Sequence, residues 1–100
     1  MSSPFFTLYT TAKAYIQLKK QNTFTLENKN DLSIKTVTIS VTSSSYFTLL
    51  ETVIKDGGFT YTADESALTI TIEWNSTEDL TFSNITSSTI YINGVEVVYE

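Results

Sequence analysis

Residues 89–99 constrain the fold more than any other part of the sequence. Asn93-Gly94 lies there between two runs of β-branched and aromatic residues, which are typical of strands. Both central residues of a type I′ turn have positive φ, so Asn-Gly between such runs predicts a two-residue β-hairpin. The register of this hairpin places four apolar residues on one face, which we expect to be buried. They are Ile90, Ile92, Val95 and Val97.

Six other segments alternate between apolar and polar residues with the period of two that predicts strands. The longest of them, residues 32–42, has Leu32 and Ile34 at even positions but Val37 at an odd one. One residue inserted near Lys35 predicts a β-bulge or a bend. The predicted strands are 12–19, 23–27, 32–42, 59–62, 67–74 and 80–83.

Residues 45–55 are predicted to form a helix. Their apolar residues recur at i, i+3, i+4, i+7 and i+8, a serine N-cap precedes them, and Gly57 and Gly58 provide a stop. The β-branched Thr48 and Thr52 leave a strand open as the alternative. The apolar stripe consists of Tyr46, Leu49, Leu50, Val53 and Ile54.

The length of 100 residues corresponds to one domain. Its many short strands predict a mainly β fold, an antiparallel sandwich or small barrel of about seven or eight strands. The helix would cover an open end or one face. We divide the chain into residues 1–11, an N-terminal arm or edge strand, and residues 12–100, a single β-rich domain.

Composition argues against several functional classes. The chain contains no histidine and no cysteine, the commonest general base and the usual thiolate ligands. We therefore expect no catalytic residues, no metal site and no cofactor. The net charge of −5 disfavours nucleic-acid binding. A run of about 18 apolar residues is absent, so we expect no membrane span.

Two acidic dipeptides, Asp64-Glu65 and Glu78-Asp79, leave a calcium site open as an alternative. They lie in predicted loops, and carboxylates from two loops that meet can bind Ca²⁺. The alternating acidic spacing of a calcium-binding loop is missing. We therefore favour two solvated loops.

Four side chains are predicted to bind a partner. Phe5 and Phe6 lie in the N-terminal arm, and Tyr91 and Val98 lie as diagonal neighbours on the outer face of the predicted hairpin. Apolar patches on small domains usually mark contacts. We therefore expect these residues to meet another subunit, unless the arm folds back over its own hairpin.

Tyrosines suggest a different kind of surface. Tyr15, Tyr46 and Tyr91 are candidates for stacking on sugar rings. The alternative is ordinary cross-strand packing on a half-exposed face.

The chain resembles the small β-rich accessory proteins of tailed-phage particles, of the capsid-decoration or fibre-anchoring type. The resembling features are the lack of cysteine and signal peptide, 18 threonines and 12 serines, and the ending Ile-Tyr-Ile-Asn-Gly-Val-Glu-Val. The resemblance implies a non-enzymatic structural protein made in the host cytoplasm and located in the virion. It would bind its own copies, as a possible homo-oligomer, or capsid or tail subunits. The alternatives are a carbohydrate-binding or adhesion module, and a small acidic inhibitor of a host enzyme.

Overall fold

The computed structural model describes residues 5–7, 16–28 and 31–99, which form strands and one helix. The long strands follow segments in which β-branched residues alternate with polar ones, a pattern that suits a half-buried pleated sheet. The elements are β1 (Phe5–Thr7), β2 (Ile16–Leu18), β3 (Thr23–Glu27), β4 (Ile34–Val41), α1 (Ser44–Asp56), β5 (Tyr61–Asp64), β6 (Thr69–Ser76), β7 (Leu80–Ser83) and β8 (Ile90–Tyr99).

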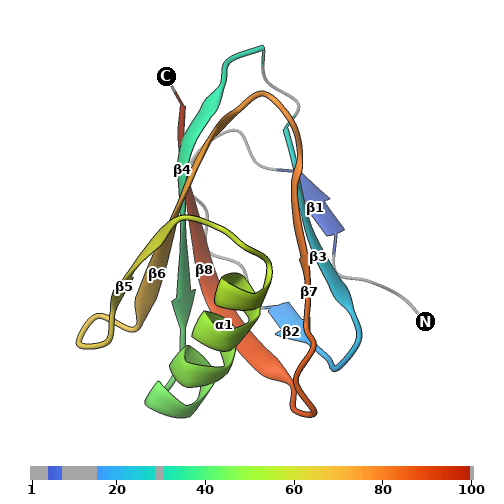
Figure 1. Ribbon diagram of the computed structural model, residues 1–100, viewed down its shortest axis with the longest axis vertical. Coiled ribbons are helices and arrows are strands. Elements are labelled where there is room, and N and C mark those ends of the chain that lie inside the picture. Colours follow the sequence, from blue (N-terminus) through green and yellow to red (C-terminus); the bar gives the residue numbers. More distant parts are fainter. Residues whose placement is uncertain (1–4, 8–15, 29–30, 100) are drawn as a thin grey trace.

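The strands form two sheets that face each other (Figure 1). A five-stranded sheet has the order β2-β8-β4-β6-β5, and a three-stranded sheet has the order β1-β3-β7. Every pair is antiparallel except β1 and β3. The prediction of a mainly β, antiparallel sandwich of seven or eight strands with one helix is therefore confirmed.

The core lies between the two sheets and is almost wholly aliphatic and aromatic. Ile70 and Ile72 of β6 are buried in one cluster with Ile90 and Val97 of β8, as the alternation predicted. Each such side chain contributes about 1.5–3 kcal/mol through its removal from water.

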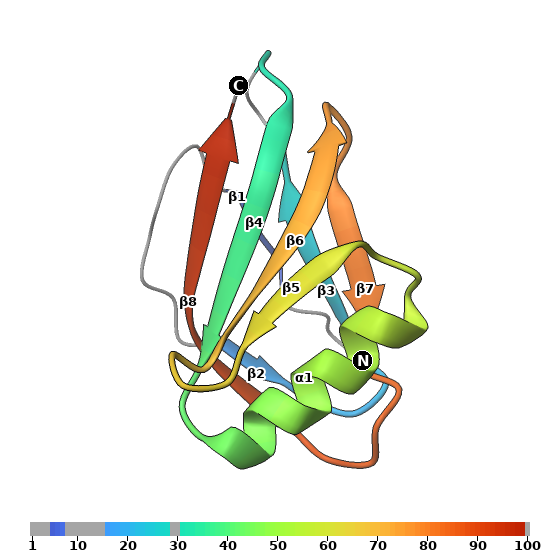
Figure 2. The ribbon, with the colours of Figure 1, turned by 60° about the vertical axis from the view of Figure 1, so that its left-hand side comes forward.

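The helix α1 closes one end of the sandwich, between the two sheets (Figures 1 and 2). Its N-cap is Ser43, which has an extended backbone and whose side-chain oxygen accepts a hydrogen bond from the Tyr46 N–H at 3.4 Å. Gly57 follows its last residue, so the predicted helix and its stop signal are confirmed. Phe47, which the predicted stripe omitted, is also buried. The buried residues are Phe47, Leu50, Val53 and Ile54.

The predicted hairpin at residues 89–99 is wrong. β8 runs without a turn through Asn93 and Gly94, and neither residue has positive φ. Ser40 of β4 pairs with Gly94 and Val41 pairs with Ile92, so Asn93 is an extra residue on β8. This bulge moves the buried positions from even to odd numbers, which is why the four predicted apolar residues are nevertheless all buried.

The bulge predicted near Lys35 is confirmed, because the pairing of β4 with both neighbours shifts between Ile34 and Thr36. The predicted strand 32–42 begins too early, because Leu32 lies before the start of β4 and is 48% exposed. With eight residues, β4 is also shorter than the ten-residue β8.

The observed ends of the remaining strands can be compared with the predicted ones. β3 and β7 have the predicted ends. β5 and β6 both lie two residues later than predicted. The turn between them occupies residues 65–68, where Leu68 has a φ of 57°, so β5 extends to Asp64 and β6 starts only at Thr69. Of residues 1–11, only β1 is described, and it lies parallel to β3 with Phe6 opposite Leu26.

Candidate functional site

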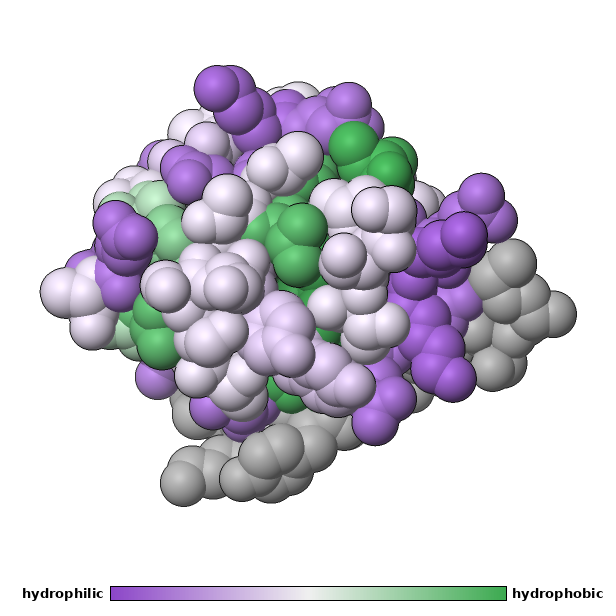
Figure 3. Space-filling view, turned by 90° about the horizontal axis from the view of Figure 1, so that it is seen from below, coloured by the Kyte–Doolittle hydropathy of each residue, from purple (hydrophilic) through white to green (hydrophobic). Residues whose placement is uncertain are grey.

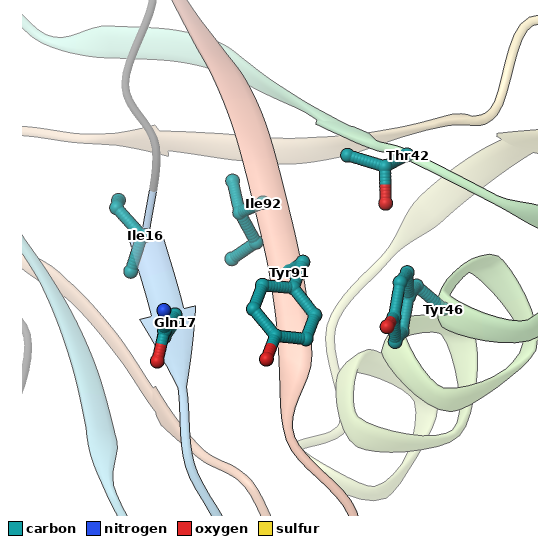
Figure 4. Close-up of a pocket in the computed structure, with 6 residues that line it drawn as sticks. All are labelled: Ile16, Gln17, Thr42, Tyr46, Tyr91 and Ile92. Atoms are coloured by element: carbon teal, nitrogen blue, oxygen red, sulfur yellow. The ribbon is translucent and has the colours of Figure 1, made fainter.

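A cavity of about 410 Å³ lies where β2, β8 and the start of α1 meet (Figure 4). Gln17 of β2 is the register partner of Tyr91 of β8, so these two side chains lie side by side. Thr42 follows the last residue of β4, and Tyr46 lies in the first turn of α1. The lining residues are Ile16, Gln17, Thr42, Tyr46, Tyr91 and Ile92.

The two tyrosines of this pocket contact each other edge to face. Their ring centroids are 5.1 Å apart and their planes are inclined by 61°. Such pairs prefer this arrangement because the positive edge of one ring meets the negative face of the other. Tyr91 remains 38% exposed, so its contact with Tyr46 leaves ring surface available.

The described lining residues of the pocket are uncharged, and their polar side-chain groups lack partners among the described residues. None of these side chains is acidic or basic. Within the described part of the chain, the side-chain carboxamide of Gln17 makes no hydrogen bond, and neither do the hydroxyls of Thr42, Tyr46 and Tyr91. The end of the molecule that carries α1 has its hydrophilic side chains mainly toward the margins (Figure 3). The pocket therefore offers aromatic surface together with unused donors and acceptors.

The last residue of β2 adjoins a polar site that the sequence analysis missed. Asn84 is fully buried, and its Nδ2 donates to the carbonyl oxygens of Leu18 and Ser88, each at 2.8 Å. Its Oδ1 accepts from the N–H of Thr86 at 2.9 Å and from the Thr86 hydroxyl at 2.6 Å. We call Asn84 and these partners the Asn84 corner. The Asn-x-Thr spacing, which allows a side chain to bond two residues on, was the available signal.

The acidic loops are not brought together as a calcium site would require. The eight residues of β6 separate Asp64 from Asp79, about 26 Å at the rise of an extended strand. Asp64 Oδ1 accepts from the Ser66 hydroxyl at 2.8 Å and from the Ala67 N–H at 3.2 Å, and these bonds lower the pKa of the carboxyl group. Asp79 Oδ1 accepts from the Asn28 N–H at 2.8 Å. Among the described residues, no three potential ligands cluster to hold a metal ion.

A second ionisable contact joins the helix to the sheet. The Tyr61 hydroxyl donates to Glu51 Oε2 at 3.2 Å. Desolvation, followed by the negative charge of Glu51 and this hydrogen bond, raises the pKa of Tyr61. The contact ties α1 to β5 and lies outside the pocket.

The predicted partner-binding residues lie in separate places. Tyr91 and Val98 are both exposed on the outer face of β8, but seven positions apart rather than as diagonal neighbours. Phe5 and Phe6 belong to the three-stranded sheet. Of the candidate sugar-binding tyrosines, Tyr46 and Tyr91 meet in the pocket, whereas Tyr15 lies outside the described residues.

No family model, curated protein or solved structure matches this chain. In the described part of the chain, no helix has the length and apolar character needed to cross a bilayer.

Proposed function

We propose that this chain is a non-enzymatic structural protein of a virus particle, and that it binds a neighbouring protein subunit. The supporting observation is the outer face of the five-stranded sheet, where α1 contacts Tyr91 at one end of β8 while Thr62, Glu73, Glu96 and Val98 are exposed. The virus-particle setting comes from the resemblance of the sequence to phage accessory proteins.

Short hydroxyl side chains dominate this outer face. Thr38 and Thr71 lie at its centre with their hydroxyl oxygens 2.9 Å apart. Threonine has one stiff χ1 angle, so it loses less rotamer freedom in an interface than glutamate, glutamine or lysine. Across β8, β4, β6 and β5, the aligned residues are Glu96, Thr38, Thr71 and Thr62 in one row and Gly94, Ser40, Thr69 and Asp64 in the next.

Val98 adds apolar area to one border of this face. It is 42% exposed and aligns with Thr36, which in turn aligns with Glu73. A surface of small side chains bordered by an exposed valine can be desolvated at modest cost. These properties support protein contact.

The charge of the face indicates which kind of subunit would fit. Asp64, Glu73 and Glu96 all lie on it. Two copies packed face to face would bring these carboxylates together, which disfavours a homodimer through this surface. The proposed partner is therefore a different protein subunit that presents lysine or arginine side chains.

The test uses Glu73→Lys and a matched control. Both Glu73 and Glu78 are exposed, and Glu78→Lys changes the net charge equally but lies in the β6–β7 loop. Tagged variants are used to recover the partner from the native source, and the affinity is then measured with the isolated partner. We expect Glu73→Lys to weaken binding roughly ten-fold or more, because it places like charges in contact.

The Glu78→Lys control should bind like the wild-type chain. Equal binding by all three proteins would contradict the proposed surface. A dimer in light scattering that Glu73→Lys disrupts would replace the heteromeric partner with a second copy.

A further inference from the structure

The pocket between β2, β8 and α1 combines aromatic surface with hydrogen-bonding groups, as small-molecule sites usually do. Tyr46 and Tyr91 offer ring surface, and Gln17 and Thr42 offer a carboxamide and a hydroxyl beside it. Figure 4 shows the Tyr91 ring between Gln17 on one side and Tyr46 on the other. A matching ligand needs an apolar face bordered by hydrogen-bonding groups.

A pyranose ring has this character. Its axial C–H groups form an apolar face that packs on an aromatic ring, and its equatorial hydroxyls both donate and accept at the edge. We propose that this pocket binds a neutral pyranose sugar.

The polar groups of the pocket suit a hydroxyl-rich edge. The Gln17 carboxamide both donates and accepts, and so do the hydroxyls of Thr42, Tyr46 and Tyr91. None has a side-chain partner among the described residues, so a ligand does not have to displace internal bonds. Burial of a sugar hydroxyl is offset only where such partners are available.

Charge and volume narrow the ligand further. Among the described residues, the lining contains no lysine and no carboxylate, so none of them favours a phosphorylated or anionic sugar over a neutral one. The volume of about 410 Å³ lies near the lower end of the roughly 300–1,000 Å³ typical of small-molecule pockets. This space suits one or two sugar rings.

The experiment titrates ¹⁵N-labelled protein with methyl pyranosides of glucose, galactose, mannose and N-acetylglucosamine. Amide resonances are followed by NMR at millimolar sugar concentration. We expect at least one pyranoside to cause saturable shifts centred on Gln17, Thr42, Tyr46 and Tyr91. Tyr91→Ala should weaken that binding about ten-fold, because it removes the stacking face.

Gln17→Ala should weaken binding roughly three- to ten-fold, because it removes one hydrogen-bonding group. Gln17 is exposed and lacks a side-chain partner among the described residues, so this variant remains informative if Tyr91→Ala fails to fold. Thr62→Ala, on the same sheet but away from the pocket, is the control and should bind normally.

Two results would overturn the proposal. One is the absence of saturable shifts at the pocket with all four pyranosides. The other is equal affinity in the wild-type chain, Gln17→Ala and Thr62→Ala. A proline-rich peptide that titrates the same amides while the sugars do not would assign the pocket to a peptide ligand instead.

Sugar binding does not depend on the proposed assembly role. Glu73→Lys leaves every lining residue of the pocket in place, so it should bind the sugar normally while losing its protein partner. Gln17→Ala should show the reverse pattern. Failure of one proposal is therefore distinguishable from failure of the other.

Discussion

Two regions that adjoin the short strand β2 use their polar groups in opposite ways. In the Asn84 corner, all four hydrogen-bonding positions of the Asn84 side chain are occupied, and the residue is fully buried. In the pocket, Gln17 and Tyr91 make no side-chain hydrogen bond among the described residues.

This contrast separates structural polarity from polarity that is available to a ligand. A buried amide with satisfied partners ties segments together, and its loss leaves those partners unpaired. An exposed amide without partners contributes little to folding. Substitutions in the Asn84 corner should therefore change the free energy of unfolding, whereas substitutions in the pocket should change the affinity for a ligand.

The largest expected effect is that of Asn84→Ala. It removes the Nδ2 donor from the carbonyl oxygens of Leu18 and Ser88, and of the two only Ser88 keeps a side-chain donor among the described residues, the Thr86 hydroxyl. We expect a loss of about 3 kcal/mol in the free energy of unfolding. Urea denaturation followed by the fluorescence of the single tryptophan, Trp74, measures it.

Asn93 provides the matched control for that measurement. Its Oδ1 is shielded from solvent and has no hydrogen-bond partner within the described part of the chain. Asn93→Ala should therefore leave the free energy of unfolding unchanged or raise it by up to about 1 kcal/mol. Equal losses at both asparagines would break the distinction between satisfied and unsatisfied polar groups.

A smaller loss in the free energy of unfolding is expected for Thr86→Ala, which removes one side-chain hydroxyl from the Asn84 corner but leaves Asn84 in place. The hydroxyl donor to Asn84 Oδ1 disappears, but the Thr86 N–H still donates to that oxygen. We expect a loss of about 1 kcal/mol. A loss as large as that of Asn84→Ala would mean that the hydroxyl, rather than the asparagine, holds the corner together.

Much of the fold could be predicted because its signals are local. Alternation defined β3 and β7, the phase change near Lys35 revealed one bulge, and the serine cap and glycine stop delimited α1. The dipeptide Asn93-Gly94 led to a wrong prediction because its preference for a turn is also a local signal. In the structure, β4 pairs with the residues of β8 that precede this dipeptide and with those that follow it. Tertiary pairing overrode the turn.

The pocket could be predicted only in part. Tyr46 and Tyr91 stood out as exposed aromatics, but nothing in the sequence states that β2, β8 and β4 are neighbours in this order. The site joins residues 16–17, 42–46 and 91–92, which become adjacent only through that strand order. Spacing within one segment does not encode such an arrangement.

Gly94→Ala tests whether the bulge, and not a turn, shapes the strand that carries Tyr91. A Cβ at Gly94 would lie 3.6 Å from Ser40 Oγ, an ordinary contact, and the backbone there does not have positive φ. Alanine also reduces the conformational freedom of the unfolded chain. We therefore expect the free energy of unfolding to stay constant or to increase by up to about 1 kcal/mol, which thermal denaturation would show as an unchanged or higher melting temperature. If Gly94 instead lay in a type I′ turn, alanine would be forced into positive φ, and the substitution would lower the free energy of unfolding by about 1–2 kcal/mol.

The smallest expected effect is that of Gln17→Ala on stability. Gln17 is exposed, its side chain has no hydrogen-bond partner among the described residues, and its backbone pairing with Tyr91 does not depend on the side chain. The free energy of unfolding should stay within about 0.5 kcal/mol of the wild-type value. Chemical denaturation alongside Asn84→Ala makes the comparison direct. A loss above 1 kcal/mol would show that the pocket, like the Asn84 corner, holds the fold together, because an amide free for a ligand contributes little to folding.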